Sequence, residues 1–511
     1  PKMADEMYPS REPTPLTELE RQNSVLGGKL ESLKDMHDIP ITALPPPYKR
    51  KPISRIYAVR AVDFKSVEYV GFDMDYTLAV YKSPAYEAMV YDLILTTLIK
   101  RGYEPSLRVL QYDEKYIIRG LLVDTHLGNF IKVDAYGNIL LGTHGSRVLS
   151  RTELLAIYPD EAISSEYVGM TKRFRLVDTY FDVPVACLYG HLIQYYEDQA
   201  VDHTSLENVR TASMELNFEL MWQDVRAATE LVHRGSEMRE KTLADLDKYV
   251  RKDAKLERLL TTLRQRKKRT FLLTNSHYDF SNAIMTYLLG EKWKSFFDIA
   301  IVAASKPSFF SGSAPLREVN TTTGQIVIGK KVTAFECASN AVYSGGSLKV
   351  FTDLIGGVTG ARVLYCGDHI FGDILTSKKV VGWRTLFVAE ELRHEVNCLE
   401  KTAGLFTHLA NLEYYKAQLF QSMDAESLEP PDISNVKDAI DATVKTIDEV
   451  FNPLFGSLFR NGFSRSYFSY QMMRYADLYT HNVTNILNYP YFYQFIPESG
   501  LQVLPHERPV A

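Results

Sequence analysis

The stretch GFDMDYTLAV, residues 71–80, places two aspartates, Asp73 and Asp75, one residue apart at the end of an apolar run. The preceding residues, VEYVGFD (67–73), combine β-branched and aromatic side chains and predict a short buried strand that ends at Asp73. Paired acids at a strand end also occur in surface turns. The meaning of this pair therefore depends on the residues at the ends of the other predicted strands.

Apolar runs of the same kind recur along the chain, and helical patterns precede or separate several of them. One helix is predicted over residues 255–268, where four leucines have helical spacing. Strands that alternate with helices predict an α/β fold with a doubly wound parallel sheet. The further predicted strands are RTFLLTN (269–275), FDIAIVAA (297–304), ARVLYCGD (361–368) and RTLFVAE (384–390).

The alternation of strands and helices is lost in two long regions, which suggests a division of the chain. One region mixes glycine-punctuated β-like pieces with a long helical stretch from about 205 to 250, and the other is mostly helical and rich in aromatic residues. The predicted parts are a lead segment with a stiff linker (1–52), a core that holds the parallel sheet (53–84 and 250–400), an inserted α+β module (85–249) and a helical C-terminal extension that packs on the core or forms a subunit interface (401–511).

Composition excludes several classes of protein. The 511 residues are 45% hydrophobic and carry a net charge of −5, which gives no reason to expect nucleic acid or an anionic membrane as a partner. No run has the roughly 18 apolar residues of a spanning helix, and the N-terminal residues lack a signal-peptide pattern. Four cysteines without a CxxC pair argue against a disulfide scaffold or a zinc site and fit a reducing, cytoplasmic location; they are Cys187, Cys337, Cys366 and Cys398.

Four predicted strands end in, or lead to, polar side chains. Ligands of open α/β sheets lie outside the carboxyl ends of the strands, so these side chains are predicted to converge. Each motif alone is typical of a turn or a helix cap, but their order along the chain is much more specific. In chain order the residues are Asp73 and Asp75, then Thr274, Asn275 and Ser276, then Ser305 and Lys306, then Asp368 and Asp373.

This set of side chains fits phosphoryl transfer. One carboxylate can accept the phosphoryl group, and a second can protonate the leaving oxygen and then deprotonate the attacking water. A hydroxyl and an ammonium group can hold the phosphate oxygens. Mg²⁺ held by carboxylates would offset the repulsion between an anionic nucleophile and its anionic target.

The ordered motifs resemble those of the haloacid-dehalogenase-like (HAD) phosphohydrolases. Longer segments resemble the cytosolic purine 5′-nucleotidases that act on IMP and GMP, and the resemblance runs from about residue 55 to 508. The segments that carry it are FDMDYTLAVYKSPAYE, KVDAYGN, QDVRAA, YSGGS, YCGDHIFGDIL, GWRT and MRYADLY.

The resemblance implies a role for each core residue. Asp73 would become the aspartyl-phosphate, Asp75 would act as general acid/base and offer Mg²⁺ its main-chain carbonyl, and Asn275 would assist in holding the phosphate. The implied catalytic residues are Asp73, Asp75, Thr274 and Lys306; the implied metal ligands are Asp73, Asp75 and Asp368, with Asp373 supporting the metal shell or Lys306.

A helix predicted near residues 218–233 would carry the specificity. Its apolar residues Phe218, Met221, Val225, Ala228 and Val232 form a buried stripe. Arg226, Glu230 and His233 line an adjacent face, which alone is typical of a solvated charge cluster. The resemblance instead implies that Arg226 hydrogen-bonds the base and that His233 and Phe181 flank its ring. The implied substrate-binding residues are Arg226, Glu230, His233, Arg239, Phe181, Asn275 and Ser276.

The chain departs from the resembled family near this pocket. Glu230 stands where the family has Asp, Arg239 where it has Lys, and Arg234 where it has Tyr. The segment before the catalytic lysine reads AASK in place of DARK, with Ala303 and Ser305 at the changed positions. The charge signs persist at Glu230 and Arg239, so a purine ribonucleotide pocket is still expected.

Mammalian members of the resembled family also bind adenine nucleotides at an activating site. Two of the family's contacts, an Arg and an Asn, fall on Val168 and Asp178 here, so weakened or altered activation is expected. The residues that match the remaining contacts are Phe371, Lys379, Gln471, Arg474 and Asp477.

The sequence therefore predicts a Mg²⁺-dependent 5′-nucleotidase that hydrolyses purine nucleoside monophosphates and can pass the phosphoryl group to a nucleoside. A HAD-type phosphatase with a different substrate is one alternative. A non-catalytic nucleotide-sensing scaffold is another, although such a scaffold would not need the intact acids and lysine. The resemblance also implies a homo-oligomer, a tetramer in that family.

Overall fold

The computed structural model describes residues 50–163, 173–202, 216–329, 332, 341–358, 360–421 and 423–497. The chain divides into two compact units between Lys51 and Pro52, and every element named below belongs to the second unit. Residues 1–49 of the predicted lead segment and Val168 lie outside the described residues. Within the described ranges, no helix is both long enough and apolar enough to cross a bilayer.

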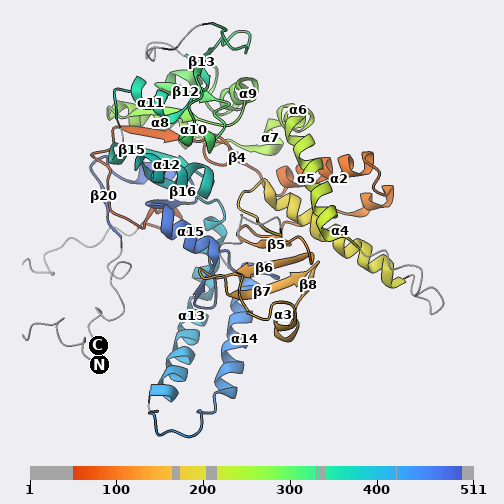
Figure 1. Ribbon diagram of the computed structural model, residues 1–511. Coiled ribbons are helices and arrows are strands. Elements are labelled where there is room, and N and C mark those ends of the chain that lie inside the picture. Colours follow the sequence, from red (N-terminus) through yellow and green to blue (C-terminus); the bar gives the residue numbers. More distant parts are fainter. Residues whose placement is uncertain are drawn as a thin grey trace, which may run out of the picture. The chain divides into compact units, whose positions relative to one another are not determined.

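A nine-stranded sheet forms the centre of this unit (Figure 1). Seven neighbouring strands run parallel, and each edge strand is antiparallel to its neighbour. The structure therefore confirms an α/β fold with a largely parallel sheet. From one edge to the other the strands are β1 (Tyr57–Ala58), β19 (Leu478–Thr480), β16 (Arg384–Val388), β15 (Val363–Gly367), β3 (Tyr69–Phe72), β11 (Arg269–Leu273), β12 (Ile299–Val302), β14 (Val342–Gly345) and β13 (Leu316–Val319).

Strand β3 lies in the middle of this order and carries Asp73 at its carboxyl end. The later strands β11, β12 and β14 lie on one side of β3, whereas β15, β16 and β19 lie on the other. The point at which strand order reverses is where open α/β sheets open a crevice for a ligand. The two acids of the opening motif therefore stand at that point.

Both faces of the sheet are buried, which explains why its strands read as unbroken apolar runs. Val70 and Phe72 pack into one hydrophobic cluster, whereas Tyr69, Phe271 and Tyr365 pack into the other. Gly71 must be a glycine, because a Cβ there would lie 2.0 Å from Cζ of Phe271 on the adjacent strand.

Helices and short turns cover the sheet. The predicted helix at 255–268 is α8 (Lys255–Gln265), and its four leucines are buried as expected. The others in this part are η2 (Pro52–Ser54), α9 (Tyr278–Leu289), η4 (Trp293–Phe296), α10 (Ser308–Ser311), α11 (Leu348–Leu354), η5 (Gly360–Arg362), the π-helical η6 (Ile370–Leu375) and α12 (Thr376–Val381).

The chain leaves this part after β4 (Val80–Tyr81) and returns at β10 (Val250–Arg251), and the two strands pair antiparallel. Between them lie a five-stranded antiparallel sheet and several helices (Figure 1). These elements are α2 (Ala85–Lys100), η3 (Pro105–Val109), β5 (Leu122–Asp124), β6 (Asn129–Val133), β7 (Ile139–His144), β8 (Arg147–Val148), α3 (Arg151–Ile157), β9 (Phe174–Leu176), α4 (Asp182–Asp202), α5 (Phe218–Arg234), α6 (Glu237–Ala244) and α7 (Leu246–Tyr249).

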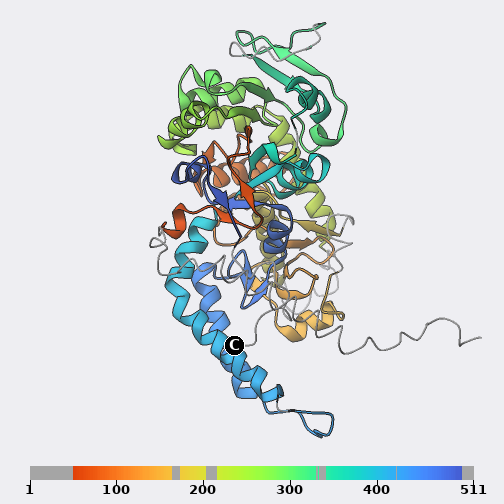
Figure 2. The same ribbon diagram turned by 90° about the vertical axis from the view of Figure 1, so that its left-hand side faces the viewer.

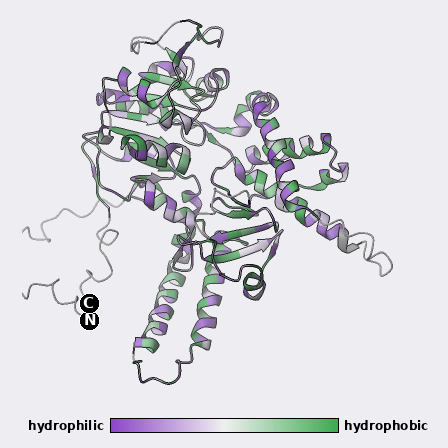
Figure 3. Cartoon of the chain, viewed as in Figure 1, coloured by the Kyte–Doolittle hydropathy of each residue, from purple (hydrophilic) through white to green (hydrophobic). Residues whose placement is uncertain are grey.

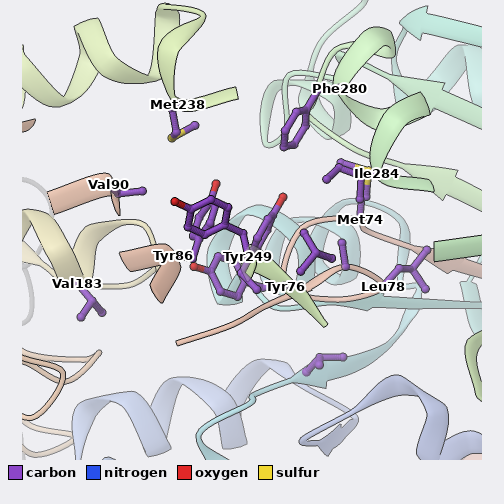
Figure 4. Packing of buried hydrophobic residues seen from close by; sticks show 14 of the residues in the cluster. Met74, Tyr76, Leu78, Tyr86, Val90, Val183, Met238, Tyr249, Phe280 and Ile284 are labelled. Carbon is purple, nitrogen blue, oxygen red and sulfur yellow. The ribbon is translucent and has the colours of Figure 1, made fainter. Parts of the chain in front are cut away.

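This region also contains the stretch that the sequence predicts to be helical. The helical stretch predicted from about 205 to 250 is divided, in its described part, into α5, α6 and α7. Gly235 ends α5 in an extended conformation, and the side chain of Asp245 accepts the main-chain N–H of Lys248 to start α7. Rings from this region meet the loop after β3: Tyr86 of α2 contacts both Tyr76 of that loop and Tyr249 of α7 edge to face (Figure 4).

The C-terminal residues contain a long helical pair. Helices α13 (Leu392–Gln421) and α14 (Ser434–Phe451) lie side by side (Figures 1 and 2), joined by the predicted loop AESLEPPDIS. Hydrophobic and hydrophilic residues alternate along both helices in Figure 3, as expected when one face of each is buried.

The same residues also contribute strands, which the prediction of a mostly helical extension did not include. Strand β19 belongs to the central sheet, and β20 (Gln494–Phe495) pairs with β2 (Val62–Asp63). The remaining elements are β17 (Arg460–Asn461), β18 (Ser464–Arg465), α15 (Tyr467–Tyr475) and η7 (Val483–Asn488).

Candidate active site

The ends of β3, β12 and β15 bring a lysine and two acids into direct contact. Nζ of Lys306 lies 2.8 Å from Oδ1 of Asp73 and 2.7 Å from Oδ1 of Asp373. It also donates to the hydroxyl of Tyr365 at 3.1 Å. The Lys306 side chain is only 4% exposed, so this cation is held among anions with little water. Residues that are hundreds of positions apart in the sequence thus form one cluster, as the strand-end pattern predicts.

The carboxylate of Asp73 is fixed from two directions. Oδ1 accepts the main-chain N–H of Met74 at 2.7 Å, in addition to the ammonium group of Lys306. Burial raises the pKa of Asp73 well above its ordinary value, Lys306 opposes this, and Asp373 adds to it. Burial lowers the pKa of Lys306, but Asp373 and Asp73 more than offset this effect, so that its pKa is raised and it is charged.

Asp75 is held separately from Asp73. Its Oδ1 accepts the hydroxyl of Tyr81 at 2.7 Å, and its Oδ2 accepts the hydroxyl of Ser276 at 2.8 Å. Burial raises its pKa, and these two hydrogen bonds oppose the rise. Tyr76, the next residue, has φ +52, a backbone conformation that is uncommon for a bulky side chain. The two acids of the opening motif therefore have different partners.

Thr274 and Asn275 shape the other side of the cluster. Thr274 is fully buried, and its hydroxyl accepts the N–H of Ser276 at 3.1 Å. The side-chain amide of Asn275 makes two hydrogen bonds with the main chain of Lys306. It donates to the Lys306 carbonyl at 3.0 Å and accepts the Lys306 N–H at 2.6 Å. Asn275 thus positions the loop that carries Lys306, a contact within the chain itself.

The altered AASK segment lies in this same loop. Ala303 has φ +47 and Ser305 has φ +59, so both departures from the DARK pattern fall on left-handed backbone. Aspartate adopts this conformation more readily than alanine does. The loop nevertheless presents Lys306 to the two acids.

Three carboxylates can meet one cation. Oxygens of Asp73, Asp368 and Asp373 all lie within 4.8 Å of one another, and all three residues are buried. Such hard oxygen donors fit Mg²⁺. Gly367 allows this approach, because a Cβ there would lie 2.5 Å from Oδ2 of Asp373. Burial and then Asp373 raise the pKa of Asp368 to about 8.

This acidic group differs from the predicted ligand set in one member. The carboxylate of Asp75 is taken by Tyr81 and Ser276, and Asp373 provides the third carboxylate instead. The main-chain carbonyl of Asp75, which is the implied ligand, is a separate donor. Two alternatives were predicted for Asp373, a place beside Lys306 or a place in the metal shell. Asp373 contacts Lys306 and also belongs to the acidic group.

The predicted base-binding residues gather around α5. A small cavity of about 190 Å³ is lined by Phe181, Arg226, Glu230 and His233 among others. Nη1 of Arg226 donates to Asp182 at 2.9 Å. The rings of Phe181 and His233 are 5.7 Å apart at 83°, which is an edge-to-face contact between the two rings themselves.

Two of the altered positions, Glu230 and Arg234, lie on this helix and line the same cavity, whereas Arg239 lies on α6. Glu230 is exposed and pairs with Arg234 at 3.4 Å, as neighbours on a helix surface do. Arg239 donates to the carbonyl of Gly235 at 3.1 Å, at the end of α5. Ser276 contacts Asp75 and is separate from this cavity.

The residues matched to an effector site lie on η6, on α12, and on or just after α15. Phe371 and Asp178 line a cavity of about 790 Å³ beside α5, and burial together with Asp182 raises the pKa of Asp178 to about 7. Arg474 lines a different cavity of about 580 Å³. Nζ of Lys379 and the guanidinium carbon of Arg474 lie 5.7 and 5.5 Å from the centre of the Tyr475 ring. Gln471 is buried, and buried Asp477 pairs with Lys378 at 2.5 Å.

Some residues that contact this site were not identified from the sequence, because they lie outside the recognised motifs or resemble ordinary strand residues. Arg119 and Glu391 form a two-bond ion pair across 272 positions, and no local pattern links them. Glu391 does lie just past the carboxyl end of β16, so the rule that placed the other acids could have included it. Tyr81 and Tyr365, which contact Asp75 and Lys306, read as ordinary strand residues.

The strand ends thus hold buried carboxylates that a lysine bridges, with Asp75 held separately beside them, and the comparison with known proteins specifies the class of protein. The model of the 5′-nucleotidase family matches residues 56–509, and the chain belongs to that family. It is a 5′-nucleotidase, a hydrolase of nucleoside monophosphates in a family of metal-dependent phosphohydrolases.

One relative covers most of this chain. A 5′-nucleotidase domain-containing protein of Dictyostelium discoideum is 32% identical over 460 residues, which is 87% of this chain and 73% of that protein.

Proposed function

We propose that the chain hydrolyses purine nucleoside 5′-monophosphates such as IMP and GMP with Mg²⁺, through an aspartyl-phosphate on Asp73. The contact of Lys306 with both Asp73 and Asp373 carries this proposal. A buried lysine that is charged beside a fixed carboxylate can neutralise a phosphate that approaches that carboxylate. The haloacid-dehalogenase-like resemblance of the ordered motifs supports the same chemistry.

In the first step an oxygen of Asp73 bonds to phosphorus and the bond from phosphorus to the ribose oxygen breaks. Among the described residues, the N–H of Met74 and the ammonium group of Lys306 both contact Oδ1 of Asp73. We therefore assign the attack on phosphorus to the other oxygen, Oδ2. Asp75 gives its proton to the leaving oxygen, and its raised pKa favours the protonated form that this requires.

In the second step water attacks the phosphorus, Asp75 takes the water proton, and the bond between phosphorus and Asp73 breaks. Ser276 and Tyr81 hold Asp75 in place in both steps. A nucleoside hydroxyl in place of water would give phosphotransfer, which we propose as a second outcome of the same intermediate. When bound by Asp73, Asp368 and Asp373, Mg²⁺ supplies charge that reduces the repulsion between carboxylate and phosphate.

Removal of the divalent cation is expected to abolish the activity. Dialysis against EDTA should lower phosphate release to background, because three buried carboxylates beside the phosphate would repel it. Addition of Mg²⁺ should restore the rate, whereas addition of Na⁺ at equal ionic strength should not. Full activity in the presence of EDTA would contradict the role of the acidic group.

Base recognition is expected to depend on α5. Replacing His233 or Arg226 by alanine should raise KM for GMP about tenfold and change kcat little, since their cavity is lined by none of the proposed catalytic residues. Lys241→Met, in an exposed helix pair, is the matched control and should leave both constants unchanged. Equal KM values in all three variants would argue against base contacts at this cavity.

The decisive experiment is a substrate panel. Phosphate release with Mg²⁺ is measured for IMP, GMP, AMP, CMP, UMP and glycerol phosphate, and kcat/KM should be highest for the purine nucleotides. Higher turnover of glycerol phosphate would favour the alternative of a phosphatase with another substrate. Turnover by wild type no higher than that of Asp73→Asn would favour a nucleotide-sensing scaffold. Cytoplasmic location and a homo-oligomer remain predictions, checked by fractionation and light scattering.

A further inference from the structure

Arg119 is a buried guanidinium group outside the four catalytic motifs. It is only 2% exposed, and it contacts the carboxyl ends of two neighbouring core strands. Its Nε and Nη2 bind the two carboxylate oxygens of Glu391 at 2.6 and 2.9 Å, just beyond β16. Its Nη1 donates to the main-chain carbonyl of Asp368 at 3.2 Å, just beyond β15. One side chain from the inserted region thus joins both strand ends.

Tyr180 completes this contact. Its hydroxyl hydrogen-bonds the Glu391 carboxylate and accepts the main-chain N–H of Glu391 at 3.1 Å. The guanidinium carbon of Arg119 lies 4.1 Å from the centre of the Tyr180 ring. We call Arg119, Glu391 and Tyr180 the arginine clamp. It is composed of two residues from 85–249 and one from the core.

The clamp also reaches the loop that carries Asp75. The Tyr180 ring stacks on Tyr76 at 4.4 Å and 13°, and Tyr76 is the residue directly after Asp75. The hydroxyl of Tyr76 donates to Glu87 of α2 at 3.2 Å. A shift of Tyr180 would therefore be transmitted to the acid/base loop, while a shift of Arg119 would be transmitted to Asp368.

We propose that Arg119 is a positioning residue for the reaction: through the clamp it holds Asp368 and the Asp75 loop in the geometry that binds Mg²⁺ and protonates the leaving group. The inference rests on the proposed function of those two acids. Arginine is required because its planar fork makes two bonds to Glu391 and a third to Asp368 at once, and a lysine cannot reproduce that geometry.

A second cluster in the same unit provides a matched control. Nε and Nη2 of Arg173 bind Asp124 at 2.9 and 2.7 Å, and the hydroxyl of Tyr158 donates to the same carboxylate at 2.8 Å. This cluster has the chemistry of the clamp, but its residues belong to the five-stranded sheet and its borders. A general loss of stability should result from a change in either cluster, whereas loss of metal positioning should result only from a change in the clamp.

The experiment compares the Arg119→Lys and Arg173→Lys variants of the whole chain. Circular dichroism first establishes that each variant is folded. Calorimetry gives the Kd for Mg²⁺, and phosphate release gives kcat, KM and the Mg²⁺ concentration at half-maximal rate. We expect Arg119→Lys to raise the Mg²⁺ Kd about tenfold and to lower kcat more than it changes KM. Arg173→Lys should change none of these by more than about twofold.

A milder pair keeps the test valid if Arg119→Lys does not fold. Tyr180→Phe removes the two hydrogen bonds that its hydroxyl makes with Glu391 and should raise the Mg²⁺ Kd about threefold to fivefold, whereas Tyr158→Phe should not. If wild type binds Mg²⁺ but the clamp variants and the control variants have equal Mg²⁺ Kd values, the positioning role of the clamp is wrong and the proposed function still stands. Wild type that neither binds Mg²⁺ nor releases phosphate would overturn the proposed function, and the inference with it.

Discussion

Replacement of Asp73 by asparagine is expected to lower phosphate release by more than about a thousandfold. The amide keeps the shape of the carboxylate and can still accept the N–H of Met74, but it cannot form a bond to phosphorus at a useful rate. The protein should remain folded, because Lys306 keeps Asp373 as its partner and one of several crowded negative charges is lost. Phosphate release and thermal unfolding measure the two effects separately.

Trapping of the intermediate makes this result specific to a nucleophile. Wild type quenched in acid during turnover should carry a phosphoryl group detectable by mass spectrometry of the peptide that contains residues 73–75, and Asp73→Asn should not. The control is Asp63→Asn, an exposed acid on β2, which should retain normal activity. Asparagine at position 73 with more than a tenth of the normal rate would exclude Asp73 as the nucleophile.

Replacement of Lys306 by methionine is expected to affect activity and stability together. Methionine fills most of the volume but leaves Asp73 and Asp373 buried without their shared cation. Breaking a buried ion pair by removal of one partner costs about 3–5 kcal/mol of unfolding free energy. Loss of the charge beside the phosphate should lower kcat by about a hundredfold or more. Urea unfolding and phosphate release measure these quantities.

Two further variants separate the causes. Adding Asp373→Asn to Lys306→Met should recover part of the stability, because it removes one of the unpaired acids, but it should not recover activity. Lys132→Met removes another buried amine, one that donates to three carbonyl oxygens at 2.6–2.7 Å, and should destabilise the protein while the folded fraction keeps its kcat. A Lys306→Met protein of normal stability would mean that the contact of Lys306 with Asp73 and Asp373 contributes little to the free energy of unfolding.

The cluster of side chains at the strand ends was predictable from the parallel order of the strands. Once the apolar runs were assigned to parallel strands, their carboxyl ends had to share an edge, and the polar residues just beyond them had to meet. Asp73, Thr274, Lys306 and Asp368 were identified by this rule. The glycines of the motifs also have a reason that the pattern alone did not give: Gly71 and Gly367 leave room for Phe271 and Asp373.

Contacts between distant segments were not predictable in the same way. The pairing of Arg119 with Glu391 depends on how the inserted region packs on the core, and no periodic pattern encodes that packing. The helix predicted near residues 218–233 agrees with α5, because amphipathic spacing marks it. The breaks in the longer helical stretch carried no such signal: Gly235 ends α5, and the side chain of Asp245 starts α7. Strand β19 has only three residues, too few for a period-two pattern to be distinguished from its aromatic surroundings.

That short strand has a consequence for biosynthesis. Strand β1 pairs with β19, so residues 57–58 find their partner only at residues 478–479. A nascent chain must therefore be extended by about 420 residues beyond β1 before this edge of the sheet can close. Until then β16 has an unpaired side on which another chain could add a strand. Translation speed and chaperone binding should consequently influence the yield of this protein more than that of a protein whose contacts are mainly local.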